Sequence, residues 1–353
     1  MCELVWFLAG LQSTDLSHKR DDGDPVDQTK VISEKVPRGR LRFLALTAIL
    51  LLVTYFYARE FQKVPFDTDT LVFSLDSGLL VAALLLCITS YLFDALIWQM
   101  VLNAQPENER KMSYRDVAVV LFCSGLLRYV PGRVWTFSAQ IAWMGRFGVR
   151  RGFPVLINLL CVVQLLLFSV YGGLIYLFFY TEGIRSLAML VFVVLVAINL
   201  IALRHGDSLV KATLRLAGRM LKRDIAPFEL PSKTLAAVQL AYIASWILLG
   251  IAVFFLARGL GLAIPIEAII PVVVAMSCSW LAGYLVIVAP AGLGVREGAM
   301  LMLLKPVLVI QTALLLPIIS RLLLVLVELL MGLYFLVVGI RNNAFTLSPL
   351  KER

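Results

Sequence analysis

Charged residues interrupt the apolar parts of this chain at two places, each beside a proline and glycines. The first break reads Arg128-Tyr129-Val130-Pro131-Gly132-Arg133-Val134-Trp135, and the second reads Pro290-Ala291-Gly292-Leu293-Gly294-Val295-Arg296-Glu297-Gly298. A guanidinium group binds phosphate through paired N–H donors. Glycines at the start of a helix let an anion approach unpaired backbone N–H groups. Both breaks therefore carry the residue types that hold a phosphate group.

Three further ionisable residues in apolar segments complete the candidate site. Arg321 and Glu328 are about two turns apart on one helical face, and Asp94 lies in another apolar segment. Placing a charge inside a bilayer costs free energy, so a charged residue there indicates a functional role. The substrate-binding residues that we predict are Asp94, Arg128, Pro131, Gly132, Arg133, Pro290, Gly292, Gly294, Arg296, Glu297, Arg321 and Glu328.

A structural interpretation of the same charges stays open. Arg296 with Glu297, Arg321 with Glu328, and Asp94 with Arg128 could be ion pairs that only hold the breaks in place. With four arginines against three acids, the set is nearly balanced. Glu297 or Glu328 could also carry a proton if it is buried.

The composition indicates a polytopic membrane protein. Of the 353 residues, 60% are hydrophobic and only 16% are charged, which is far from the average of soluble domains. The net charge of +9 does not indicate nucleic-acid binding, because the basic residues lie at the ends of apolar segments, where they set topology. The five cysteines and two histidines have no metal-ligand spacing, so we expect no metal and no cofactor.

Apolar segments with basic flanks predict an all-α protein with about six spanning helices. They cover residues 41–58, 78–102, 153–180, 186–203, 235–257 and 306–340 within one transmembrane domain, 41–340. Residues 1–40 and 341–353 are polar, and most of the 32 Lys and Arg residues fall on the same side, so both termini are predicted to be cytoplasmic. Residues 207–223 predict an amphipathic helix on the anionic lipids of the cytoplasmic surface.

The two interrupted segments predict re-entrant hairpins of broken helices. The arms 117–127 and 134–144 are too short to span the hydrocarbon core, and basic flanks place both ends of this hairpin in the cytoplasm. The arms 266–288 and 298–304 form a second hairpin that enters from outside. Residues 78–180 and 235–340 therefore predict an inverted repeat whose broken helices meet near the midplane. If the longer arms cross completely, the number of spans is larger.

The two motifs, in this order, resemble the flippase-like membrane family typified by the transmembrane half of lysylphosphatidylglycerol synthases. The matching stretches are 129–135 and 290–298, the resemblance covers residues 41–340, and Ala291 stands where the family usually has a second glycine. The resemblance implies a transporter, not an enzyme, that moves a phosphate-bearing lipid between leaflets. A polyprenyl-phosphate-linked sugar, a glycolipid intermediate and a phospholipid all fit. Because no soluble aminoacyl-transfer domain follows residue 340 in this chain, we expect no lipid aminoacylation.

Rival functions and partners also follow from the sequence. A membrane glycosyltransferase with a polyprenyl-phosphate sugar donor is the alternative, since Asp67 and Asp69 could bind a metal or act as a base. A scaffold subunit without transport is a third hypothesis. We expect a prokaryotic cell (inner) membrane as the location. A second copy of the chain or a lipid-modifying enzyme could be a protein partner.

Overall fold

The computed structural model describes residues 59, 75–106, 111–129, 134–150, 152–208, 210–212, 228–286, 292 and 294–341. Within these ranges, all regular secondary structure is helical. Six helices there are long and apolar enough to cross a membrane, so the predicted all-α polytopic membrane protein is confirmed. The expected span 41–58, both tails, most of 207–223, and Asp67 and Asp69 lie outside the described residues.

The long helices follow the apolar runs of the sequence closely. They are α3 (Ser77–Asn103), α6 (Gly152–Tyr180), α7 (Arg185–Arg204), α9 (Ser232–Gly259), α10 (Ile269–Leu285) and α12 (Ile310–Arg341). A helix satisfies its own backbone polar groups, which lipid cannot do. In α7 only Ala188 is buried, so its apolar side chains are available to contact lipid.

The first predicted break separates two short helices. The helices α4 (Tyr114–Leu126) and α5 (Val134–Gly145) flank it, and the 3-10 turn η2 (Leu127–Tyr129) ends the first arm. Ser113 begins α4 as its N-cap, because its hydroxyl accepts a hydrogen bond from the backbone N–H of Asp116 at 3.2 Å. The break thus places Arg128 at the end of a short helix.

The second break has arms of unequal length. The 3-10 turn η4 (Ile266–Ala268) and α10 form a first arm that is itself long enough to cross a membrane. It replaces 41–58 in the set of six spans. The second arm, α11 (Val295–Leu304), begins earlier than the predicted residue 298. The reason is local. Gly294 adopts a φ of 81°, and its backbone N–H donates a hydrogen bond to the Glu297 side chain at 2.6 Å. This contact caps the N-terminus of α11.

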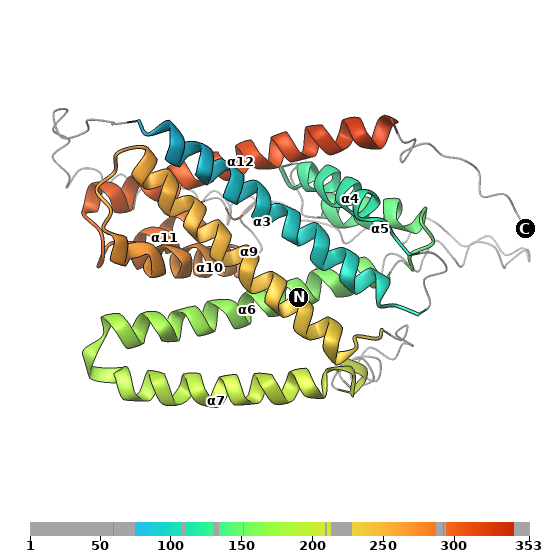
Figure 1. Ribbon diagram of the computed structural model, residues 1–353, viewed down its shortest axis with the longest axis horizontal. Coiled ribbons are helices and arrows are strands. Elements are labelled where there is room, and N and C mark those ends of the chain that lie inside the picture. The colour runs from blue at the N-terminus through green and yellow to red at the C-terminus, as the bar shows by residue number, and fades with distance from the viewer. Residues whose placement is uncertain are drawn as a thin grey trace, which may run out of the picture. The chain divides into compact units, whose positions relative to one another are not determined.

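Helices α3 and α9 pack against each other in antiparallel directions (Figure 1). At one end the backbone N–H of Asp76 donates to the carbonyl of Gly259 at 2.9 Å. At the other end the Gln105 amide donates to the carbonyl of Glu229 at 2.7 Å. Between them, the Ser90 hydroxyl donates to the Ser245 carbonyl at 2.9 Å. The register is therefore fixed along the whole helix pair.

The remaining helices pack in a pattern that stays the same when the two halves are exchanged. The broken helix α4 packs on α12 of the other half, and α10 packs on α6 of the first half. Phe122 of α4 stacks on Phe335 of α12, with ring centroids 5.1 Å apart. A side chain at Gly172 of α6 would meet Val274 of α10. Each hairpin therefore lies against the last helix of the opposite repeat, which is the arrangement of an inverted repeat.

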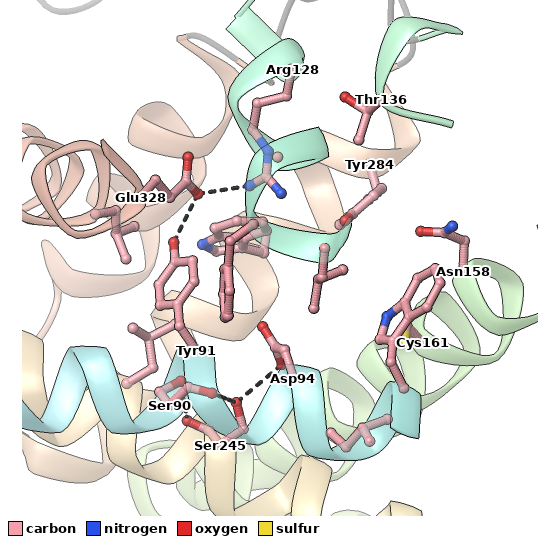
Figure 2. A pocket seen from close by; sticks show the side chains of 18 of the residues that line it. Ser90, Tyr91, Asp94, Arg128, Thr136, Asn158, Cys161, Ser245, Tyr284 and Glu328 are labelled. Carbon is pink, nitrogen blue, oxygen red and sulfur yellow. Dashed lines mark hydrogen bonds and ion pairs between the residues drawn. The ribbon is translucent and has the colours of Figure 1, made fainter. Parts of the chain in front are cut away.

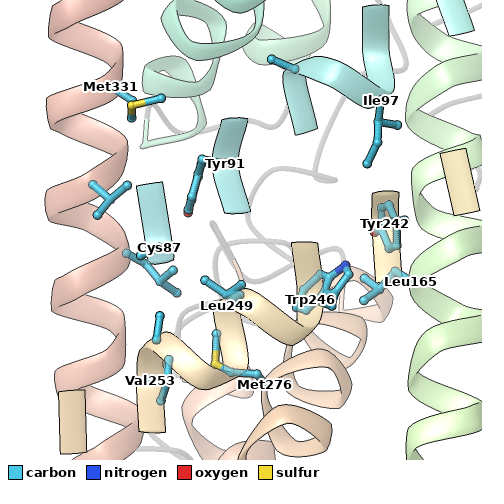
Figure 3. Packing of buried hydrophobic residues seen from close by; sticks show 14 of the residues in the cluster. Cys87, Tyr91, Ile97, Leu165, Tyr242, Trp246, Leu249, Val253, Met276 and Met331 are labelled. Carbon is cyan, nitrogen blue, oxygen red and sulfur yellow. The ribbon is translucent and has the colours of Figure 1, made fainter. Parts of the chain in front are cut away.

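An apolar core fills the space between α3, α9, α10 and α12 (Figure 3). Cys87, Leu249, Val253 and Met276 are among its buried members. Pro317 lies inside α12 without ending it. The core holds the two repeats together beside the polar residues described next.

Candidate functional site

A cavity of about 210 Å³ lies between the two repeats. Helices α3, α4, α5 and α6 line it from the first repeat, and α9, α10, α11 and α12 line it from the second. Five of the predicted site residues face it, namely Asp94, Arg128, Arg296, Arg321 and Glu328. An arginine from each break, Arg128 and Arg296, therefore lines one cavity, part of which is drawn in Figure 2.

The other predicted residues have different places. Pro131, Gly132, Arg133 and Pro290 lie outside the described residues. Gly292 and Gly294 belong to the turn before α11, and Glu297 lies with Arg296 and Arg321 in a small neighbouring pocket. These three residues position the cavity-lining arginines instead of lining the larger cavity themselves.

An ion pair joins the two repeats across the cavity. Arg128 Nη1 lies 2.7 Å from Glu328 Oε1, and the Tyr91 hydroxyl donates to the same oxygen at 2.8 Å. Figure 2 shows both contacts meeting at Glu328. The Glu328 side chain is only 10% exposed, whereas that of Arg128 is 36% exposed. The carboxylate is thus held inside, and the guanidinium remains accessible from the cavity.

A second pair lies at the base of α11. Arg321 Nε is 3.9 Å from Glu297 Oε1, and the two side chains are 16% and 13% exposed. The other Glu297 oxygen accepts from Gly294. This carboxylate is occupied by capping and pairing, which agrees with a structural role. Among the described residues, ion pairs join Arg128 with Glu328 and Arg321 with Glu297, whereas the structural interpretation of the sequence named Arg296 with Glu297, Arg321 with Glu328 and Asp94 with Arg128.

Arg296 is held by packing instead of by an acid. Its guanidinium carbon lies 3.7 Å from the centroid of the Trp280 ring, a close cation–π contact. A Cβ at Gly283 would come within 2.5 Å of Arg296 Nε, and one at Gly292 within 2.8 Å. Gly292 also has a φ of 68°, which disfavours any side chain there. The two glycines and the tryptophan form a cradle for this one arginine.

The cradle leaves the hydrogen-bonding capacity of Arg296 unused. Its Nε is buried and has no hydrogen-bond partner, and no carboxylate of the described residues lies within ion-pair distance of it. The guanidinium lines the cavity. A cation in this setting is poorly compensated, so it attracts an anion that enters the cavity.

Asp94 faces the cavity from α3 with few contacts. The Ser245 hydroxyl approaches Asp94 Oδ1 at 3.5 Å, and it lies closer, at 3.1 Å, to the carbonyl of Ser90. A serine hydroxyl has one proton to donate, so the Ser245 hydroxyl donates mainly to the Ser90 carbonyl and only weakly to Asp94. Figure 2 shows Asp94 and Glu328 on separate sides of the cavity.

Aromatic and amide side chains form the rest of the wall. Trp246 contacts Trp280 edge to face, with centroids 5.9 Å apart, and Trp280 in turn lies next to Tyr284. Asn158 donates to the Gln140 side chain at 2.8 Å. None of these aromatic and amide residues was among the predicted site residues. The signal for this wall was the spacing of four residues in Tyr242/Trp246 and in Trp280/Tyr284, which places each aromatic pair on one helical face.

Comparisons with known proteins give no match for this chain, either among models of protein families or among curated proteins. The fold and the cavity define the class: an integral membrane protein of helices with a charged cavity between two halves. Its activity is therefore inferred from the chemistry of the cavity.

Proposed function

We propose that this protein moves a phosphate-bearing lipid between the leaflets of a membrane, with the phosphate held in the cavity between the repeats. One observation carries the proposal: Arg296 lies in the cradle of Trp280, Gly283 and Gly292 with its Nε buried, and it has no acid partner among the described residues. A phosphate group supplies the missing charge and accepts planar, paired hydrogen bonds from a guanidinium. The ammonium of a lysine does not match that geometry.

The ion pair between the repeats suggests how binding and movement are linked. Arg128 belongs to the first hairpin and Glu328 to the last helix of the second repeat. A phosphate near Arg296 competes with Glu328 for Arg128, because both are anions that accept from the same N–H groups. Loss of this pair loosens one repeat from the other, and rocking of the repeats then exposes the cavity to the opposite leaflet.

The lipid class follows from the cavity and from the family resemblance. With about 210 Å³, the cavity is below the roughly 300–1,000 Å³ of drug-sized ligand sites, so it holds a small head group while the tails stay in lipid. A polyprenyl-phosphate-linked sugar, a glycolipid intermediate and a phospholipid share this phosphate chemistry. We further propose membership of the flippase-like family, for which the stretches 129–135 and 290–298 are the support. We also propose a location in a prokaryotic inner membrane with cytoplasmic termini, and the positions of the basic residues in the sequence support this orientation of the termini.

Translocation in reconstituted vesicles tests the proposal. Purified protein is incorporated into liposomes with fluorescent phosphatidylglycerol or fluorescent polyprenyl phosphate, and dithionite quenches only the label in the outer leaflet. We expect Arg296→Ala to slow translocation at least tenfold, equivalent to about 1.4 kcal/mol, and Arg296→Lys to recover only part of the rate. Equal rates for wild type and Arg296→Ala, with both proteins folded, would falsify the role of Arg296.

A further inference from the structure

The three acids around the cavity differ in how well they are compensated. Glu328 has Arg128 and the Tyr91 hydroxyl, and Glu297 has Arg321 and a backbone N–H group. Asp94 has only the long contact with Ser245, and no arginine of the described residues lies within ion-pair distance of it. Asp94 is thus the least stabilised of the three carboxylates, so it is the one that is protonated most readily when an anion enters the cavity.

Several ionisable side chains surround Asp94. From its own helix α3 come Cys87 and Tyr91, from α4 and η2 come Tyr114 and Arg128, and from α6 comes Cys161. The second repeat contributes Tyr242 from α9, Tyr284 from α10, Arg296 from α11, and Arg321 and Glu328 from α12. Of the cations in this set, Arg128 and Arg321 already have carboxylate partners.

The charge balance of these described residues has two neutral states. Arg128, Arg296 and Arg321 carry three positive charges, and Glu297 and Glu328 carry two negative charges. With an ionised Asp94, these six residues are together neutral while the cavity is empty. A singly charged phosphate diester brings one further negative charge, so the loaded cavity is neutral only when Asp94 is protonated. Net charge in a low-dielectric site is strongly unfavourable, which selects these two states.

We propose that Asp94 is a proton-binding site, and that the protein carries one proton together with each singly charged phosphate lipid. This inference rests on the proposed function, since the anion that drives protonation is the transported head group. Lipid and proton then move in the same direction as a neutral pair. Each unit of pH difference across the membrane supports about a tenfold accumulation of lipid in one leaflet.

Proton uptake on binding is the direct test. Calorimetric titration of detergent-solubilised protein with dioctanoyl phosphatidylglycerol, in two buffers of different ionisation enthalpy, gives the number of protons taken up per lipid. We expect about one for wild type and none for Asp94→Asn. Glu182→Gln is the matched control, since Glu182 is 88% exposed and should leave the uptake unchanged. No uptake by wild type, or uptake that survives in Asp94→Asn, overturns the inference.

A spectroscopic measurement covers the case in which Asp94→Asn binds no lipid. The infrared difference spectrum between lipid-bound and empty wild-type protein should contain a new carbonyl band from a protonated carboxyl. This band should change its frequency in Asp94→Glu, which keeps an acid at the site. A spectrum without the band, or a band that Asp94→Glu leaves unchanged, assigns the proton elsewhere and overturns the inference.

Vesicle transport separates the proton inference from the proposed function. With a pH gradient of one unit, wild type should accumulate labelled phosphatidylglycerol in the leaflet toward which protons flow, and a potassium diffusion potential alone should not change the rate. The ratio of rates with and without the gradient should fall to one in Asp94→Asn. Wild-type transport that does not depend on the pH gradient would overturn the proton coupling but not the proposed lipid translocation. If wild type moves neither phosphate lipid, the proposed function fails, whereas the titration still decides whether Asp94 binds a proton.

Discussion

Ser90 and Ser245 form hydrogen bonds in both directions where α3 and α9 meet. The Ser90 hydroxyl donates to the Ser245 carbonyl at 2.9 Å, and the Ser245 hydroxyl lies 3.1 Å from the Ser90 carbonyl. The two residues are 155 positions apart in the sequence and make the same contact from opposite sides, as equivalent residues do at a two-fold axis. The pair marks the point about which the two repeats are related.

The reciprocal serine contact should appear as energetic coupling. In membrane proteins such hydrogen bonds contribute about 0.6 kcal/mol on average. We therefore expect Ser90→Ala and Ser245→Ala each to lower the free energy of unfolding by about this amount, and the double variant to lose less than the sum. Denaturation in mixed micelles measures the cycle, with the exposed Ser186→Ala as a control of no effect. Strict additivity would show that the two hydroxyls act independently.

The sequence was sufficient to predict most of the described helices and the places where two of them are interrupted. Apolar runs specify where a chain can cross lipid, and the prolines and glycines at 131–132 and 290–294 mark where a helix must stop. Arg128, Arg296, Arg321 and Glu328 were identified because charges are rare in such segments. That they line one cavity agrees with the predicted meeting of the two hairpins.

The contacts between those residues could not be predicted from sequence. Arg128 is 200 positions from its partner Glu328, and their contact depends on how α4 packs against α12. Arg321 was paired with Glu328 in the sequence because they share a helical face, but it is Glu297 that lies 3.9 Å from Arg321, after the tight turn at Gly294. The first arm of the second break was predicted as 266–288 and is helical over 266–285; hydropathy gave its extent but did not decide whether it crosses the membrane.

The glycine cradle predicts that Arg296 can be disabled without changing any charge. In Gly283→Ala the new Cβ would lie 2.5 Å from Arg296 Nε, so the guanidinium must leave its place beside Trp280. We expect phosphatidylglycerol binding, measured by microscale thermophoresis in detergent, to weaken at least tenfold. The matched control is Gly173→Ala in α6, where the added Cβ meets nothing within 4 Å. Wild-type affinity in Gly283→Ala would show that the position of Arg296 does not govern binding.

The ion pair between the repeats predicts opposite effects on binding and on translocation. In Glu328→Gln the side chain can still accept the Tyr91 hydrogen bond but no longer competes as an anion for Arg128, 2.7 Å away in the wild type. Because the pair is partly exposed, we discount it to about 1 kcal/mol, which corresponds to about fivefold tighter binding of phosphatidylglycerol. Translocation should become slower, because phosphatidylglycerol that is bound more tightly leaves the cavity more slowly after the repeats have rocked. Thermophoresis and the dithionite assay on the same preparation measure both effects. The control is Tyr91→Phe, which removes one hydrogen bond to Glu328 and leaves the ion pair in place, and should change affinity less than twofold. Weaker binding in Glu328→Gln would mean that Glu328 orients Arg128 toward the phosphate instead of competing with it.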